Sequence, residues 1–174
     1  MSVLELPDSK SSRLIDPWLQ RIGEVTSWLW LLLLLIIVGN VVARYAFGEG
    51  SIELEEIQWH IYSVGFLLGM SYAFQADAHI RVDVVSERLQ PRTRAWLELY
   101  GLLLGLLPFI FLFLIHGIPF VYHSWQLSEV SQAPGGLPYR WLIKAFMPLG
   151  FFLLLLAAWS RLTRVWLFLF GTQR

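Results

Sequence analysis

An apolar segment of about twenty residues, Ile57 to Ala76, is the feature that most limits how this chain can fold. At a rise of about 1.5 Å per residue, a helix of this length matches the roughly 30 Å hydrocarbon core of a bilayer. The polar residues around it are Glu53, Glu55 and Glu56 before it, and Asp77, His79, Arg81 and Asp83 after it. The segment therefore predicts a membrane-spanning helix. Its basic end is expected in the cytoplasm, because Lys and Arg near span ends are retained on that side.

The composition places the whole chain in the membrane class. Of its 174 residues 56% are hydrophobic and only 15% are charged, whereas a soluble domain carries about 25% charge. The formal net charge is +0, so no nucleic-acid partner is expected. The chain has no cysteine, which excludes disulfides, thiolate nucleophiles and Cys-ligated clusters.

Hydropathy and charge together predict an all-α integral membrane protein with four transmembrane helices. The expected spans are approximately 25–47, 57–76, 95–122 and 139–160, in a single domain, 1–174, that begins with a flexible stretch, 1–12. With these spans, three of the 13 Lys and Arg residues lie on the outer side, namely Arg44, Arg140 and Lys144, and ten on the inner side. This asymmetry predicts cytoplasmic N- and C-termini.

Two amphipathic segments and several prolines add detail. Apolar residues at three-to-four spacing over 14–25 predict a helix with Asp16 and Pro17 at its start, either lying among the lipid headgroups or extending the first span. The apolar face of 80–89 predicts a short helix on the membrane surface. Pro108 and Pro119 are expected to bend the long third span, and Pro138 to open the fourth.

Few side chains inside the spans carry chemistry. Asn40, Ser63, Ser71 and Gln75 are small polar groups of the kind that join membrane helices. No HExxH, GxSxG, CxxC or phosphate-binding glycine loop is present, so the sequence predicts no enzyme, no metal site and no cofactor. One alternative stays open: His60 and His116 share a depth in the predicted spans and could ligate a b-type haem in a respiratory membrane anchor, or could simply be packing histidines.

The short first loop brings Arg44 close to the start of the second span. Its stem can stay in lipid while the guanidinium reaches the surface. We expect Arg44 to pair with Glu55 or Glu56, fixing the hairpin and leaving the other carboxylate for a partner. The alternative is a solvated acidic loop.

Four short sequences occur in a distinctive order: RYAF at the end of the first span, EE at the start of the second, AHIRVDVV after it, and PGGLPYRW before the last. Together with four predicted spans, this order resembles the small membrane subunit of tripartite ATP-independent periplasmic (TRAP) transporters, the DctQ type. The resemblance covers about residues 13–159.

The resemblance implies a multi-pass protein of the bacterial inner membrane that works with a large TRAP permease subunit, a periplasmic solute-binding protein and membrane lipids. The small subunit would brace the scaffold of the large one for sodium-coupled uptake of an organic acid or similar solute. Its outer segments, 48–56 and 126–138, would be available to the binding protein; the second contains Pro134, Gly135 and Gly136 and ends at Pro138. His79, Arg81 and Asp83 would lie at the cytoplasmic surface, capping a helix, contacting lipid phosphate or serving as ordinary surface polarity. A free-standing structural membrane protein is a further alternative.

Overall fold

The computed structural model describes residues 6–48, 50–78 and 89–171, and every regular element in this part of the chain is helical. Their bounds are α1, Lys10–Phe47; α2, Ile52–Gln75; α4, Pro91–Tyr100; η1, a π-helical segment, Gly101–Leu106; α5, Leu107–Gln126; and α6, Arg140–Phe170. Helices α4, η1 and α5 follow one another without a break, so the described residues form four long rods.

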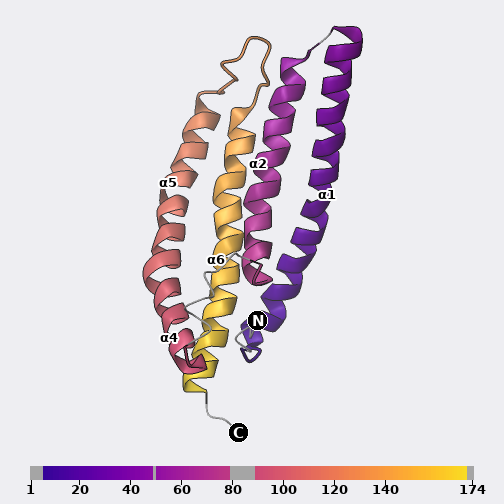
Figure 1. Ribbon diagram of the computed structural model, residues 1–174. Coiled ribbons are helices and arrows are strands. Elements are labelled where there is room, and N and C mark those ends of the chain that lie inside the picture. The colour runs from indigo at the N-terminus through magenta and orange to yellow at the C-terminus, as the bar shows by residue number, and fades with distance from the viewer. Residues whose placement is uncertain (1–5, 49, 79–88, 172–174) are drawn as a thin grey trace.

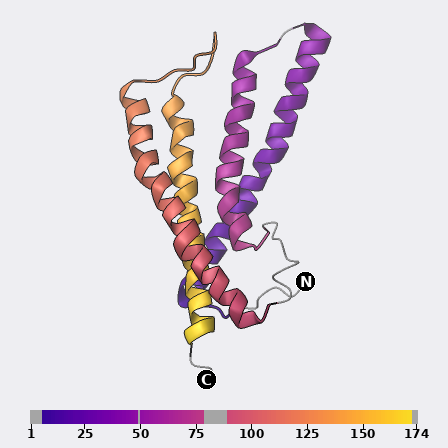
Figure 2. The ribbon, with the colours of Figure 1, turned by 60° about the vertical axis from the view of Figure 1, so that its left-hand side comes forward.

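The four rods lie side by side in a curved layer in the order α5, α6, α2, α1 (Figure 1). Neighbouring rods in this order pack against each other, and α1 also reaches α6. Both hairpin loops lie at one end of the layer, whereas the start of α1 and the end of α6 lie at the other. Figure 2 shows the α1–α2 hairpin diverging from the α5–α6 hairpin toward the loop end.

Helix α1 is one continuous helix that starts earlier than the sequence predicts. Ser9 is its N-cap and forms a reciprocal capping box with Ser12. The expected helix start at Asp16 and Pro17 is therefore wrong. The physical reason is tertiary, because Ser9 also hydrogen-bonds Thr163 of α6 at 2.8 Å. Of the two interpretations of residues 14–25, the structure has the one in which they extend the first span.

The buried face of α1 repeats every seven residues. Five of the six buried residues follow this spacing, namely Ser12, Leu19, Thr26, Leu33 and Asn40, and the sixth, Gly23, lies one turn after Leu19. A seven-residue repeat keeps one face of a helix against a neighbour that crosses at a shallow angle, as in left-handed helix pairs. This repeat explains how a helix of 38 residues follows its neighbours along the layer.

The third rod contains the π-helical segment η1 just before Pro108. At its end the Leu107 N–H donates to the carbonyl of Leu102, five residues back. Pro108 has no N–H to continue the α-helical ladder, and its ring crowds the carbonyl four residues earlier. The sequence predicted an irregularity at Pro108, and the irregularity takes the form of a wider turn.

Close backbone approach joins the two hairpins in the middle of the layer. A Cβ on Gly150 of α6 would lie 2.7 Å from the backbone oxygen of Leu67 in α2, so only glycine fits there. Nearby, Phe151 and Leu154 of α6 pack against Ile110 of α5 in a buried apolar cluster. Helix α6 is therefore the central element, with apolar contacts on both sides.

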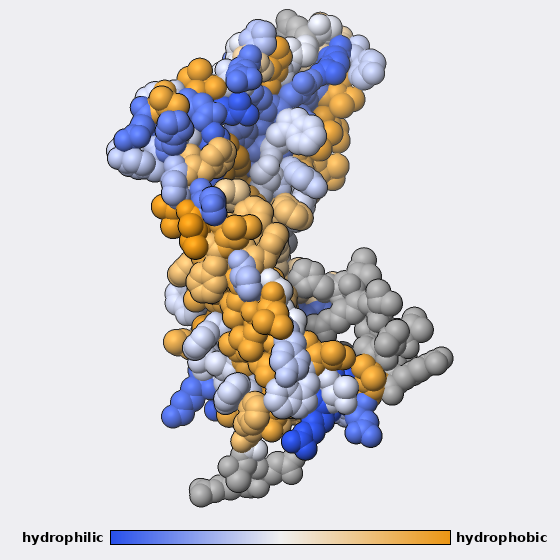
Figure 3. All heavy atoms as spheres, turned by 90° about the vertical axis from the view of Figure 1, so that its left-hand side faces the viewer, coloured by the Kyte–Doolittle hydropathy of each residue, from blue (hydrophilic) through white to orange (hydrophobic). Residues whose placement is uncertain are grey.

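Three of the rods are long and apolar enough to cross a membrane, namely α1, the α4–η1–α5 rod and α6. The face on the α5 side shows a band of hydrophobic residues between hydrophilic ends (Figure 3). Helix α2, which contains most of the expected span 57–76, is not apolar enough to be counted with these three. Its 24 residues run parallel to the other rods and are long enough for a bilayer.

Candidate functional site

The loop end of the α1–α2 hairpin is held by an ion pair. Helix α1 ends at Phe47, and its C-cap residue Gly48 adopts the left-handed conformation. Ser51 caps the start of α2 by accepting a hydrogen bond from the Leu54 N–H at 3.2 Å. Across this turn the Arg44 guanidinium pairs with Glu55, one of the two partners expected from the sequence. Both side chains remain about half exposed, at 51% and 45%. Exposed pairs of this kind contribute less than about 1 kcal/mol.

The other carboxylate, Glu56, is not left for a partner as expected. It accepts hydrogen bonds from the Ser131 hydroxyl and, at 2.6 Å, from the Leu137 N–H, both in the α5–α6 loop. The Ser131 hydroxyl, and then the Leu137 N–H, hold the pKa of Glu56 below its ordinary value of 4.5. Glu56 therefore connects the two hairpins where they diverge.

The α5–α6 loop is shaped to receive this carboxylate. Gly135 has a φ of +78°, and a Cβ on Gly136 would lie 2.5 Å from the Ser131 Cβ and 2.9 Å from Glu56 Oε1. Pro134 and Pro138 are exposed. Pro138 does not open α6 as expected, because Tyr139 adopts the left-handed conformation and the helix starts at Arg140.

A third contact closes the base of the same loop. Lys144 of α6 pairs with Glu129 and lies over the Phe120 ring, with Nζ 4.2 Å from its centroid. The hydrogen bond from Lys144 lowers the pKa of Glu129. Neither residue was predicted as a site residue, although two opposite charges at the two ends of a hairpin loop are a sequence signal for such a pair.

At the opposite end of the layer, Arg161 of α6 is the centre of an ionic cluster. Only 8% of the residue is exposed. It pairs with Glu98 of α4 and, at 3.1 Å, with Asp77 at the end of α2. Asp77 has a φ of +58°, which Asp tolerates better than most residues. Arg161 thus joins three elements that are distant in sequence.

The start of α1 joins the same cluster. Asp16 accepts a hydrogen bond from Ser160 at 2.5 Å and lies 3.7 Å from Arg164. Arg164 also donates to the carbonyl of Leu6 at 3.2 Å and lies 3.9 Å from Asp8. We call the two arginines Arg161 and Arg164, with their acidic partners Asp8, Asp16, Asp77 and Glu98, the terminal ionic cluster. None of these contacts was predicted from the sequence, because the partners come from separate elements.

The charged groups gather at two levels along the rods, one near each end, with an uncharged band between them. Along α2, the distance from Glu56 to Asp77 is about 31 Å at the helical rise; along α6, Lys144 to Arg161 is about 26 Å. No Asp, Glu, Lys or Arg occurs between the members of either pair. The spacing matches a hydrocarbon core of roughly 30 Å.

The remaining predicted site residues do not meet in one place. His79, Arg81 and Asp83 lie outside the described residues. His60 and His116 lie on α2 and α5, on either side of α6 in the layer, and line different pockets. This separation does not favour a haem held between them. Among the described residues, no group of three or more His, Cys, Asp or Glu side chains could hold a metal ion.

The arrangement defines a class of protein: a helical protein with membrane-spanning candidates whose polar side chains tie its rods together at both ends. The family is shown by sequence comparison, because the model of the family "Tripartite ATP-independent periplasmic transporters, DctQ component" matches residues 33–168. The chain belongs to this family, so the resemblance drawn from its sequence is confirmed. Comparisons with curated proteins and with solved structures give no match.

Membership makes the chain a small permease component of a TRAP transporter in the inner membrane, a transport component and not an enzyme. It also implies association with the large permease subunit and a solute-binding protein in one complex. The haem-anchor alternative has no support in the family match.

Proposed function

We propose that this small permease subunit braces the scaffold of the large permease subunit during sodium-coupled, binding-protein-dependent uptake of an organic acid or similar solute. The observation that carries the proposal is the single layer of rods fixed at both membrane boundaries. Glu56 and Lys144 fix the loop end, and the terminal ionic cluster fixes the other. A wall of this kind suits a stationary support, because its helices cannot slide past one another without breaking buried ion pairs.

The same proposal includes four spans with both termini in the cytoplasm. The length and polar ends of α2 support a fourth span, because Glu56 and Asp77 at its two ends lie at the two charged levels. The hairpin end contains Arg44, Arg140 and Lys144, the three basic residues assigned to the outer side. The chain has no cysteine, so Gly50→Cys and Lys10→Cys variants, at exposed positions, can be labelled with a membrane-impermeant maleimide in intact cells. We expect labelling at position 50 only; labelling at position 10 would reject this orientation.

The outer loops are the proposed contact region for the solute-binding protein. Glu53, Pro134 and Gly135 are exposed at the hairpin end. Their position on the outer side follows from the proposed orientation. Charge reversal at Glu53, which no described contact holds, tests this region without disturbing the Glu56 connection.

The function is tested by reconstituting the large permease subunit and the binding protein in liposomes, with and without this chain. Sodium-driven uptake of the cognate solute is expected only when the chain is present. Binding of solute to the isolated binding protein is expected to be unchanged, because the recognition site lies in another chain. Uptake at full rate without the chain would refute the proposal.

A further inference from the structure

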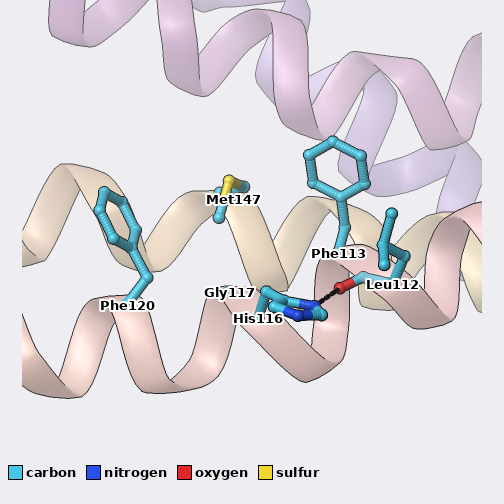
Figure 4. A pocket seen from close by; sticks show the side chains of 6 residues that line it. All are labelled: Leu112, Phe113, His116, Gly117, Phe120 and Met147. Carbon is cyan, nitrogen blue, oxygen red and sulfur yellow. Dashed lines mark hydrogen bonds between the residues drawn. The ribbon is translucent and has the colours of Figure 1, made fainter.

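A pocket on the outer half of the α5–α6 hairpin contains a polar group whose surroundings do not satisfy it. The pocket has a volume of about 480 Å³ and is lined by Leu112, Phe113, His116, Gly117 and Phe120 of α5 and Met147 of α6. Figure 4 shows Phe113 and Phe120 at its two ends, Met147 between them and His116 along its side. Except for the imidazole, the lining side chains are apolar.

The hydrogen bond of His116 determines which nitrogen is available. Nδ1 lies 2.9 Å from the carbonyl oxygen of Leu112 (Figure 4). A carbonyl can only accept, so Nδ1 carries the proton. In the neutral imidazole Nε2 is then an acceptor, and it has no hydrogen-bond partner among the described residues. The ring is exposed on the surface of the subunit.

The depth of His116 makes this acceptor significant. Phe120, which Lys144 covers, lies one turn nearer the outer surface, about 6 Å away along the helix. His116 is therefore on the hydrocarbon side of Lys144 and of the other charged side chains at the loop end of its hairpin. A polar group facing lipid there loses its hydrogen bond with water, and polar side chains within spans normally face protein or a water-filled cavity.

The place of α5 in the layer leaves this face open. Within the described chain α5 packs against α6 and forms one edge of the layer. Ile115 and Ile118, next to the pocket, are 65% and 61% exposed. The open edge, the apolar pocket and the unsatisfied acceptor therefore coincide on one stretch of helix.

From this coincidence we infer that the His116 pocket is a docking site for a transmembrane helix of the large permease subunit. That helix places an apolar side chain between Phe113 and Phe120 and a hydrogen-bond donor against His116 Nε2. The inference rests on the proposed function, which supplies the partner, and adds the surface and the chemistry of the contact. Lipid alone supplies the apolar filling but no donor at this depth.

Photocrosslinking in the assembled complex tests the contact. A photoreactive phenylalanine analogue is placed at Leu112 or Phe120 of the full chain, coexpressed with its large permease subunit, and adducts are identified by mass spectrometry. Leu104, 75% exposed on the same rod but outside the pocket, is the matched control. Adducts with a transmembrane peptide of the large subunit at Leu112 and Phe120, exceeding those at Leu104, are expected. Adducts with lipid alone, while the subunits still copurify, would overturn the inference and leave the proposed function intact.

The hydrogen bond is tested separately with a pair of identical substitutions. His116→Leu should raise the apparent Kd for the large subunit in nanodiscs about three- to fifteenfold, the range for one interhelical hydrogen bond in a membrane. His60 makes the same bond to the carbonyl four residues earlier, but its pocket includes Leu137 and Pro138 of this chain's own loop. His60→Leu should leave the Kd unchanged. Equal effects of the two substitutions on the Kd, or no effect of His116→Leu, would refute the inference. Failure of the unmodified chain to bind the large subunit would refute the proposed function as well.

Discussion

Arg161 offers the sharpest test of how the rods are held together. Replacing it with Ala removes the cation between Glu98 and Asp77, whose side chains are only 15% and 19% exposed. Leaving a buried charge without its partner costs about 3–5 kcal/mol. Some water reaches both carboxylates, so we expect a loss of about 3 kcal/mol, at the lower end of that range.

The loss can be measured as a change in thermal stability. A change of 1 kcal/mol shifts the Tm of a domain of this size by about 2–4 °C, so Arg161→Ala should lower the apparent Tm in nanodiscs by about 6–12 °C. The nine tryptophans provide the signal, and Trp96 lies close to the cluster, where it packs against Phe170. Arg21→Ala, at an exposed position of α1, is the control and should change little.

A further variant separates charge from packing. If the cost comes from the two carboxylates losing the cation they share, combining Arg161→Met with Glu98→Gln and Asp77→Asn should recover much of the stability, because the charges are then removed together. An Arg161→Ala protein that unfolds at the same temperature as Arg21→Ala would refute the assignment of this cluster as a structural tie. So would a triple variant less stable than Arg161→Ala.

Three other expectations concern the outer end and the centre of the layer. Because the pKa of Glu56 is lowered, its contribution to the stability of the folded chain is complete above the ordinary carboxyl pKa and is lost as the pH falls through the lowered pKa. The Tm difference between the unmodified chain and Glu56→Gln should therefore be largest at pH 7 and shrink below pH 4.5. A Tm difference that does not change with pH would contradict this. Gly150→Ala should destabilise by about 1–3 kcal/mol in urea or thermal unfolding, since its methyl group meets the Leu67 backbone, whereas Gly39→Ala, with no atom within 4 Å, should be neutral or stabilising. Arg44→Ala should cost less than about 1 kcal/mol, and a Tm loss equal to that of Arg161→Ala would show that the exposed pair is more important than its geometry indicates.

Local patterns in the sequence predicted the rods well. Apolar runs of about twenty residues marked the long helices, and the short loop after Arg44 was enough to bring it to Glu55. These features depend on residues close together in the chain, so hydropathy and spacing are sufficient to recognise them. The family resemblance used the same kind of information, namely the order of short motifs.

The ties between the rods could not be predicted in this way. Glu56 meets residues 75 and 81 positions away, and Arg161 meets Glu98 across 63 positions. Each partner is an ordinary charged or polar residue at a span end, where such residues are common for solvation alone. The early start of α1 was missed for a similar reason, because Ser9 is held by Thr163 of the distant last helix.

The π-helical segment has a consequence for the tolerance of this chain to insertions and deletions. Buried positions of the third rod are seven apart from Ala95 to Leu102, which lies in the first turn of the segment, and again from Ile110 to Gly117 beyond it, but eight apart from Leu102 to Ile110. The wider turn thus absorbs one surplus residue without rotating the face that packs on α6. Losing one residue between Gly101 and Leu106 would leave an ordinary α-helix with an unbroken seven-residue repeat. A deletion anywhere in α2 would instead rotate every later side chain by about 100°, so homologues that differ in length within a span should differ at this turn.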